Sequence, residues 1–430
     1  MNKNSIMKKR LFIVSFVVLK CAIGSASFSN SEKYMDAYPF EMAFKVSDGY
    51  IPLSEKELNY PLRKEDILKS ATLVNDYFMN HYPDVGAPSY VGGKQRDSKM
   101  WTRGVYYAGL MAMYAQSPNP KWLKYAVDWG EFHHWKAGVG NASRHADFQC
   151  CGQAYLDLYL LDSSRSERKA HIKELIDNML GTDKIDDWHW VDALFMAMPI
   201  FAQIGWIEND NRYFERMYQM YMYTRNNQGG DERCGGKPLL NEQDGLWYRD
   251  YRYDSPYMDL VETDKPCYWS RGNGWAYAAL ARVLHYSPDN MVHKEQYIHD
   301  FKLMSEALLK CQRSDGFWSV SLAAASNTGD SRSPGPETSG TALFVAGMAY
   351  GINAGILNRK TYLPSVLKGW NALSKIAVRG KDGLLGYVQG AGSQPEHGQP
   401  TLKDRTPEFE DFGVGCFLLA AAEVYRLAEN

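Results

Sequence analysis

Six apolar stretches rich in small residues recur along the chain and limit the folds that it can adopt. Alanine, glycine and aromatic residues fill nearly every position of each stretch, as in "RGNGWAYAALARVLHY", which is typical of a helix buried on all sides. Amphipathic stretches, such as 167–180 and 297–312, lie between them. The sequence therefore predicts six buried helices that alternate with six amphipathic ones. The buried stretches begin at Thr102, Cys150, Val191, Arg271, Ser339 and Phe412.

We expect these helices to form a closed ring of six hairpins, an (α/α)6 toroid of the all-α class, with the small-residue helices inside. An open stack of hairpins needs polar capping repeats at its ends, whereas the last buried stretch, from Phe412, is as apolar as the others. A second repeat, Asp-Gly followed by apolar residues, occurs at Asp244, Asp315 and Asp382. In such a ring, the N-terminal ends of the inner helices line one mouth.

The N-terminus predicts an exported protein. Residues 1–26 match a secretory signal peptide, with a basic start, a short apolar core and small residues at the cleavage position. Cys21 follows a lysine, which is wrong for a lipoprotein signal, so we expect a periplasmic or secreted bacterial protein without a lipid anchor. Residues 27–60 are predicted to form an N-terminal extension, and residues 61–430 a single toroidal domain.

Charge and cysteine content narrow the classes of partner. A net charge of −2 and a pI of about 6.6 give no reason to expect a nucleic acid or a membrane surface as partner. The sequence has no C-x-x-C and no H-E-x-x-H, so we expect no metal site and no cofactor. We expect the cysteines to be buried thiols. The sequence leaves undecided whether one or two disulfides form, and it does not give the oligomeric state. The 29 Tyr, 12 Trp and 17 Phe residues also suit a sugar-binding cleft, but composition alone favours a large core.

Two aspartates stand out at the N-terminal ends of predicted inner helices. Asp192 lies between Val191 and Ala193, where an ionised carboxylate is costly unless it is paired, hydrogen-bonded or protonated. Asp147 precedes the second buried stretch, and its residue type suits either a helix N-cap or a functional group. Both aspartates are therefore candidate catalytic residues.

Further candidates follow from the motif "WSRGNGW". Arg271 lies between Trp269 and Trp275, and a guanidinium between two indoles suits a sugar carboxylate. Pairing of Arg271 with Asp192 is the structural alternative. The other candidate substrate-binding residues are Asn273, Arg249, Trp101, Trp190, His145 and His189. The two histidines among them also fit a buried structural role.

The motifs "WVDALFMAMP", "WSRGNGW" and "ETSGTALF", in this order on repeated helical hairpins, resemble glycoside hydrolase family 105. Those enzymes are the unsaturated rhamnogalacturonyl hydrolases, and they are similar to the family 88 unsaturated glucuronyl hydrolases. The resemblance covers most of the chain from about residue 60 onward. It implies a ring of six α/α hairpins and, in pectin degradation, a substrate oligosaccharide whose non-reducing end is a 4,5-unsaturated uronic acid.

The resemblance also implies a reaction. A proton is added at C4 of the unsaturated sugar, water adds at C5, and the resulting hemiketal opens to release the aglycone. By resemblance, Asp192 is the general acid and base, Asp147 binds sugar hydroxyls, and Arg271 with Trp275 holds the substrate. Arg249 stands where relatives commonly carry a histidine, so an aglycone other than rhamnose stays open.

Two other classes of function compete with this hypothesis: a different enzyme on the same scaffold, either a glycosidase or a lyase, and a non-enzymatic glycan-binding protein. An ordinary (α/α)6 glycosidase needs two carboxyl groups about the anomeric carbon, which Asp147 and Asp192 also provide. A polysaccharide lyase on the same scaffold needs a basic or tyrosine catalyst. A non-enzymatic glycan-binding protein of the cell surface usually needs a lipobox cysteine, which Cys21 does not supply.

Overall fold

The structure is a computed structural model, and all the residues that it describes belong to one compact unit, Val46–Asn430. The predicted signal peptide, residues 1–26, lies outside the described residues and stays a prediction, and the predicted extension is described only from residue 50. The described residues are 50–91, 94–138, 143–230, 236–254, 266–323, 336–395, 397–398, 401–404 and 411–428.

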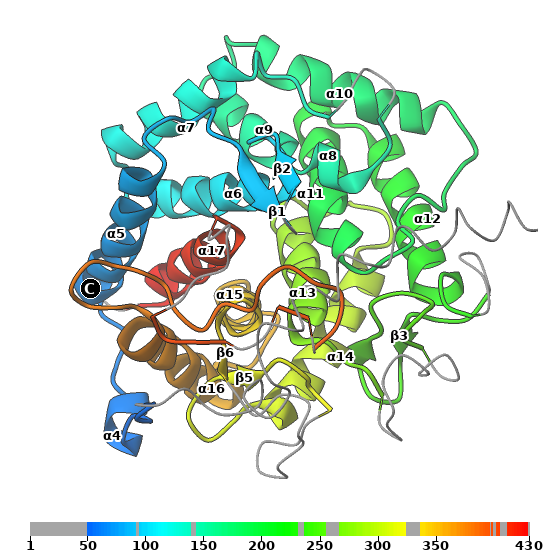
Figure 1. The fold of residues 1–430 in the computed structure, drawn as a ribbon. Helices are drawn as coiled ribbons and strands as arrows, with labels where there is room; N and C mark the ends of the chain where they lie inside the picture. Colours follow the sequence, from blue (N-terminus) through cyan, green and yellow to red (C-terminus); the bar gives the residue numbers. More distant parts are fainter. Residues whose placement is uncertain are drawn as a thin grey trace, which may run out of the picture. The chain divides into compact units, whose positions relative to one another are not determined.

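Six helices form the inner layer of this unit, and they coincide with the six small-residue stretches (Figure 1). Each packs against the next, and the last packs against the first, so the inner layer is a closed ring. In order around the ring, the helices are α6 (Trp101–Gln116), α9 (Gly152–Leu161), α11 (Asp192–Glu208), α13 (Ser270–His285), α15 (Thr338–Asn353) and α17 (Asp411–Leu427).

Six amphipathic helices cover the inner ring. Five of them pack against the inner helix that precedes them in the chain, whereas α5 packs against α17, so the first long helix completes the last hairpin. The predicted (α/α)6 toroid is therefore confirmed. The outer helices are α5 (Lys64–His81), α7 (Pro120–Phe132), α10 (Glu167–Leu180), α12 (Asn211–Asn227), α14 (Lys294–Cys311) and α16 (Arg359–Ala372), the last of which continues into a π-helical turn, Leu373–Ala377.

Residues before the predicted domain start at 61 also contact the ring. The short helix α4 (Glu55–Leu58) packs against α16, and Ser54 caps it through its side chain. The hydroxyl of Tyr50 donates a hydrogen bond of 2.7 Å to Asp315, which belongs to the second Asp-Gly repeat. The part of the predicted extension that is described thus lies against the toroid.

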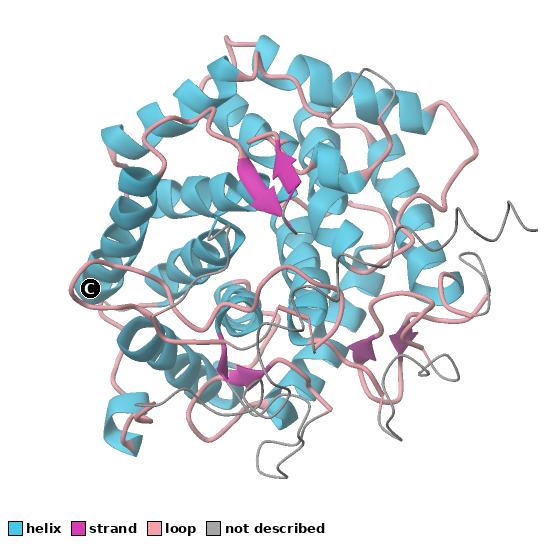
Figure 2. Ribbon diagram, in the orientation of Figure 1, coloured by secondary structure: helices cyan, strands magenta, loops and turns pink. Residues whose placement is uncertain are grey.

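Three short antiparallel hairpins lie outside the helices (Figure 2). The Asp-Gly repeats mark the turns that lead back from outer helices α12, α14 and α16. Asp315 and Asp382 each accept a hydrogen bond from the backbone N–H two residues later, which closes the turn. The hairpins pair β1 (Ser89–Val91) with β2 (Lys94–Arg96), β3 (Leu240–Asn241) with β4 (Leu246–Trp247), and β5 (Trp318–Ser319) with β6 (Pro336–Glu337).

The inner helices all point in one direction. Residues from the second halves of all six line a cavity of about 510 Å³ at one end of the ring. Residues at the beginnings of several of them line a second cavity at the other end. The predicted convergence of the inner-helix N-termini on one mouth is thus present.

The described residues also bear on the cysteines and on membrane association. Cys150, Cys151, Cys311 and Cys416 are free thiols, whereas Cys234 lies outside the described residues. Among the helices that the structure describes, none combines the length and apolar character that crossing a membrane requires.

Ring closure brings the backbones of α6 and α17 into contact. A Cβ atom on Gly109 would lie 2.2 Å from the carbonyl oxygen of Gly415. A Cβ atom on Gly415 would lie 2.4 Å from the carbonyl oxygen of Val105. These distances are too short for any side chain, so glycine at both positions is what permits the two helices to meet.

Replacing Gly109 with alanine is therefore expected to destabilise the fold by about 1 to 3 kcal/mol, because the new Cβ forces the two helices apart. This loss should exceed the gain in helix propensity of about 1 kcal/mol. Gly380→Ala is the matched control, since a Cβ there has no neighbour within 4 Å. Denaturant unfolding gives both values, and a Gly109→Ala variant as stable as the Gly380→Ala variant would contradict this account of ring closure.

Candidate active site

A cavity of about 310 Å³ opens at the mouth where the inner helices begin. Its described lining includes six of the residues that the sequence singled out, and they come from segments more than a hundred residues apart. The lining residues are Trp101, Asp147, Trp190, Asp192, Met196, Arg249, Trp269, Ala391 and Gly392.

Asp192 is the first residue of α11, and this position explains how an aspartate enters so apolar a stretch. The helix begins there, so the carboxyl group faces the cavity rather than the helix packing, and its side chain keeps 13% of its exposure. Burial raises the pKa of Asp192, while the positive charges of Arg249 and Arg271 oppose the rise. Burial and the two cations thus act on this carboxyl group in opposite directions.

Asp147 lies in the short helix α8 (Ala146–Gln149), which precedes α9. His145, not Asp147, occupies the N-cap position, and its ring nitrogen accepts a hydrogen bond of 3.3 Å from the Asp147 N–H. The N-cap alternative for Asp147 is therefore wrong. Burial and the nearby Asp192 carboxyl group raise the pKa of Asp147 to about 7, against the opposing charges of Arg249 and Arg96. Two carboxyl groups with raised pKa values thus face one cavity.

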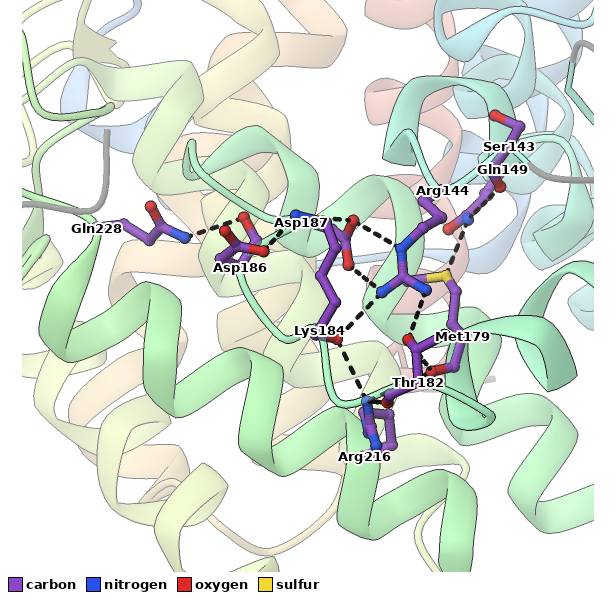
Figure 3. A network of polar contacts seen from close by, with 10 residues as sticks. All are labelled: Ser143, Arg144, Gln149, Met179, Thr182, Lys184, Asp186, Asp187, Arg216 and Gln228. Atoms are coloured by element: carbon purple, nitrogen blue, oxygen red, sulfur yellow. Dashed lines mark hydrogen bonds and ion pairs between the residues drawn. The ribbon is translucent and has the colours of Figure 1, made fainter. Parts of the chain in front are cut away.

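An ion pair between Arg144 and Asp187 joins the two chain segments that carry these aspartates (Figure 3). The guanidinium donates two hydrogen bonds to the Asp187 carboxylate, at 2.9 and 2.5 Å. It also donates to the Thr182 hydroxyl and to the Lys184 carbonyl, at 3.0 and 3.1 Å. Because this bidentate contact lies three residues before Asp147 and five before Asp192, it fixes the two segments relative to each other.

Arg249 enters the cavity from the segment after β4. Its carbonyl oxygen accepts a hydrogen bond of 2.8 Å from the Val191 N–H, which ties this segment to the start of α11. Its Nε lies 3.3 Å from Oδ2 of Asp192, and its Nη1 donates to Asp250. Arg252 also donates to Asp250, whose pKa is lowered by these two arginines although burial acts to raise it.

Arg271 is not among the described residues that line the cavity, and its expected contact with the substrate stays a prediction. Its Nη1 and Nη2 donate hydrogen bonds of 2.8 Å to the carbonyl oxygens of Gln389 and Gly390. Its guanidinium lies between the rings of Trp269 and Phe412, at 4.6 and 4.8 Å from their centroids, and not between Trp269 and Trp275. Arg271 thus holds the segment that presents Ala391 and Gly392 to the cavity.

Asn273 and Trp275 are not among the described lining residues either, and their expected substrate contacts stay predictions. The Asn273 side chain accepts from the Trp247 N–H and donates to the carbonyl oxygens of Trp247 and Trp269, which uses both ends of the amide. Trp275 is fully buried and packs against Phe195 and Trp101. The two side chains support residues that line the cavity.

Three tryptophans, Trp101, Trp190 and Trp269, line the cavity as expected from a sugar-binding site. His145 and His189 lie against Trp190, with ring centroids 5.0 and 4.5 Å from the indole. Burial lowers the pKa of His145, which favours its neutral form. Neither histidine is among the described lining residues, and their expected contacts with the substrate stay predictions.

Sequence reasoning missed the segment that supplies Ala391 and Gly392. Gln389 organises it: its side chain accepts a hydrogen bond of 2.8 Å from the Trp269 indole, and its N–H donates to Glu337 at 3.2 Å. Glu337 in turn caps α15 by accepting from two backbone N–H groups. Glu337 lies in the motif "ETSGTALF", but nothing local in the sequence links that motif to the third Asp-Gly repeat.

The cavity therefore offers two carboxyl groups, a cation and indole faces. In the described part of the chain, no group of three or more His, Cys, Asp or Glu side chains gathers as metal ligands would. An arrangement of this kind suits general acid–base chemistry on a carbohydrate.

Comparison with known proteins gives the family. The sequence profile described as Glycosyl Hydrolase Family 88 matches residues 70–428. A protein of Formosa agariphila named unsaturated 3S-rhamnoglycuronyl hydrolase is 30% identical over 346 residues, which cover 76% of this chain and 85% of that protein. The chain therefore belongs to glycosyl hydrolase family 88, and it is a glycoside hydrolase. This assignment confirms the resemblance drawn from the motifs.

Two solved structures are similar over the same region. A glycosyl hydrolase family 88 protein from Bacteroides vulgatus has a TM-score of 0.73 and 33% identity, over 85% of this chain and 99% of that one. A protein described as a polysaccharide lyase has a TM-score of 0.73 and 31% identity, over 85% of this chain and 98% of that one. Both likenesses agree with the ring of six hairpins.

The raised pKa of Asp147 makes stability depend on pH. Because the folded protein holds this proton up to about pH 7 and the unfolded chain releases it near pH 3.8, stability should fall as pH rises between these values. Asp147→Asn removes this loss, so the variant should gain stability relative to wild type on going from pH 4 to pH 8. A shift of about three units sets an upper limit of about 4 kcal/mol, and we expect about 1 to 2 kcal/mol because the side chain keeps 25% of its exposure.

Urea unfolding at the two pH values measures this change, with Asp183→Asn on an exposed loop as the control for the chemical substitution alone. An Asp147→Asn variant whose stability relative to wild type is the same at pH 4 and pH 8 would show that Asp147 is not held in its neutral form.

Proposed function

We propose that the enzyme removes a 4,5-unsaturated uronic acid from the non-reducing end of oligosaccharides, with rhamnose as the neighbouring sugar. The observation that carries the proposal is the pair Asp192 and Asp147, which face one cavity with raised pKa values. The name of the Formosa agariphila relative, a rhamnoglycuronyl hydrolase, supports rhamnose as the aglycone.

The chemistry follows from a buried acid next to an electron-rich double bond. Asp192 donates its proton to C4, and the cation that forms is stabilised by the ring oxygen. Water then adds at C5 and returns a proton to the Asp192 carboxylate, so one group serves as acid and then as base. The product is a hemiketal that opens and releases the aglycone. Burial helps the first step because it favours the neutral form of Asp192.

The other lining residues have complementary roles in this proposal. Trp101, Trp190 and Trp269 offer indole faces to the sugar ring. Arg249 is the cation that the described lining provides for the uronate carboxylate. Asp147, beside Asp192, hydrogen-bonds to sugar hydroxyls, and the Asp192 carboxyl group helps to keep the proton on Asp147, since two adjacent carboxylates do not both ionise readily.

Incubation with lyase-generated oligosaccharides tests the proposal. The ultraviolet absorbance of the conjugated double bond should fall in step with release of the rhamnose-terminated aglycone, because hydration consumes that double bond. A saturated uronoside with the same aglycone should be inert, since it has no vinyl ether to protonate. Efficient cleavage of the saturated compound would instead favour an ordinary glycosidase.

Asp192→Asn is the inactive variant for this assay, because it keeps the shape of the side chain and removes the proton. We expect turnover to fall by about 10² to 10⁴, with an unchanged circular dichroism spectrum. Asp157→Asn is the control, since Asp157 lines the cavity at the opposite mouth. Near wild-type turnover of Asp192→Asn would assign Asp192 to the structure alone.

A second candidate function is polysaccharide lyase activity, which one observation favours: a similar solved structure is described as a lyase. A lyase creates the unsaturated sugar that the hydrolase consumes. The same absorbance would then rise on incubation with the intact polysaccharide, and unsaturated oligosaccharides would be left unchanged.

A further inference from the structure

Arg249 lies between two carboxylates that hold it very differently. On one side it donates to Asp250, which also receives hydrogen bonds of 2.9 and 2.7 Å from Arg252. On the other side its Nε faces Oδ2 of Asp192 at 3.3 Å. Both Arg249 Nε and Asp192 Oδ2 are buried, and neither atom makes a hydrogen bond of ordinary geometry within the described part of the chain. Arg249 is thus firmly anchored at Asp250 and loosely engaged at Asp192.

This loose contact conflicts with the role of Asp192 as an acid. A neighbouring cation favours the carboxylate, whereas donation to C4 needs the protonated form. The charged groups that face Asp192 are Arg249, Arg271, Asp250 and, across the cavity, Asp147. Arg271 is committed to two carbonyl oxygens behind the wall, whereas Arg249 lines the cavity and can reach an incoming ligand.

We propose that Arg249 exchanges partners when the substrate binds: its guanidinium leaves Asp192 for the uronate carboxylate, and Asp192 takes up the proton that it then donates to C4. The proposal rests on the proposed function, because it assigns the source of the catalytic proton. Charge and atoms balance, since one proton passes from solvent to Asp192 while Arg249 stays a cation and the uronate stays an anion. The anchor at Asp250 keeps the guanidinium near the cavity during the exchange.

Proton uptake on binding measures the exchange without turnover. Calorimetric titration of the enzyme with D-glucuronate, in buffers of different ionisation enthalpy across pH 6 to 8, gives the number of protons bound per ligand. We expect wild type and Asp147→Asn to take up as much as one proton per site at the pH of greatest uptake. Asp192→Asn should take up none. Arg249→Gln should take up less than half as much as wild type and bind about ten- to a hundredfold more weakly.

The pH profiles of the reaction give an independent readout. In wild type, the apparent pKa above which kcat falls should be about one pH unit higher than the apparent pKa above which kcat/KM falls. The reason is that kcat reports the enzyme–substrate complex and kcat/KM the free enzyme. In Arg249→Gln, the apparent pKa for kcat/KM should rise to match the one for kcat. Arg249→Lys, which keeps the charge, should retain most of the separation, whereas a purely structural role would make the two variants behave alike.

Arg282→Gln is the matched control for both measurements. Arg282 pairs with Asp157 at 3.4 Å, both side chains keep 13% of their exposure, and they lie at the opposite mouth. The exchange is overturned if Arg249→Gln takes up as many protons as wild type, or if the two wild-type profiles coincide. If unsaturated oligosaccharides are never consumed while proton uptake follows the expected pattern, the proposed function falls and the exchange stands.

Discussion

The meeting of α6 and α17 is the contact on which the rest of the structure depends. These helices begin about 310 residues apart in the chain, and their backbones approach so closely that neither Gly109 nor Gly415 has room for a Cβ atom. Because this contact closes the inner ring, all six inner helices begin at one mouth. The closed ring is therefore what brings Trp101, Asp192 and Trp269 into one cavity.

Within that cavity, burial and charge act against each other. Burial raises the pKa values of Asp147 and Asp192, whereas Arg249 lowers both. The bidentate Arg144–Asp187 pair fixes the spacing of the segments that carry the two acids, so their mutual influence is built into the fold. In this account, the substrate changes the balance by drawing the cation away, so that Asp192 carries its proton when the proton is needed.

The sequence predicted the parts of this arrangement that depend on local pattern. Small-residue periodicity identified the inner helices, and an aspartate in an apolar stretch identified Asp192. The hydrogen-bond partners of Arg271 and Asn273 could not be predicted, because they are backbone atoms of distant segments, 118 and 26 residues away. A guanidinium looks the same in a sequence whether it binds a substrate carboxylate or two buried carbonyl oxygens. The Arg144–Asp187 pair was missed for the same reason, since nothing local links the two residues.

The most direct test of the central claim is the position of the atoms that water contributes to the product. When unsaturated oligosaccharides are turned over in deuterated, oxygen-18-labelled water, hydration of the double bond places deuterium on C4 and the labelled oxygen on C5 of the released uronic acid. Mass spectrometry and NMR of the product, quenched early, locate both labels. The account predicts a C4 deuteron in every turnover. Labelled oxygen at the anomeric carbon, with C4 unlabelled and the double bond intact, would contradict it.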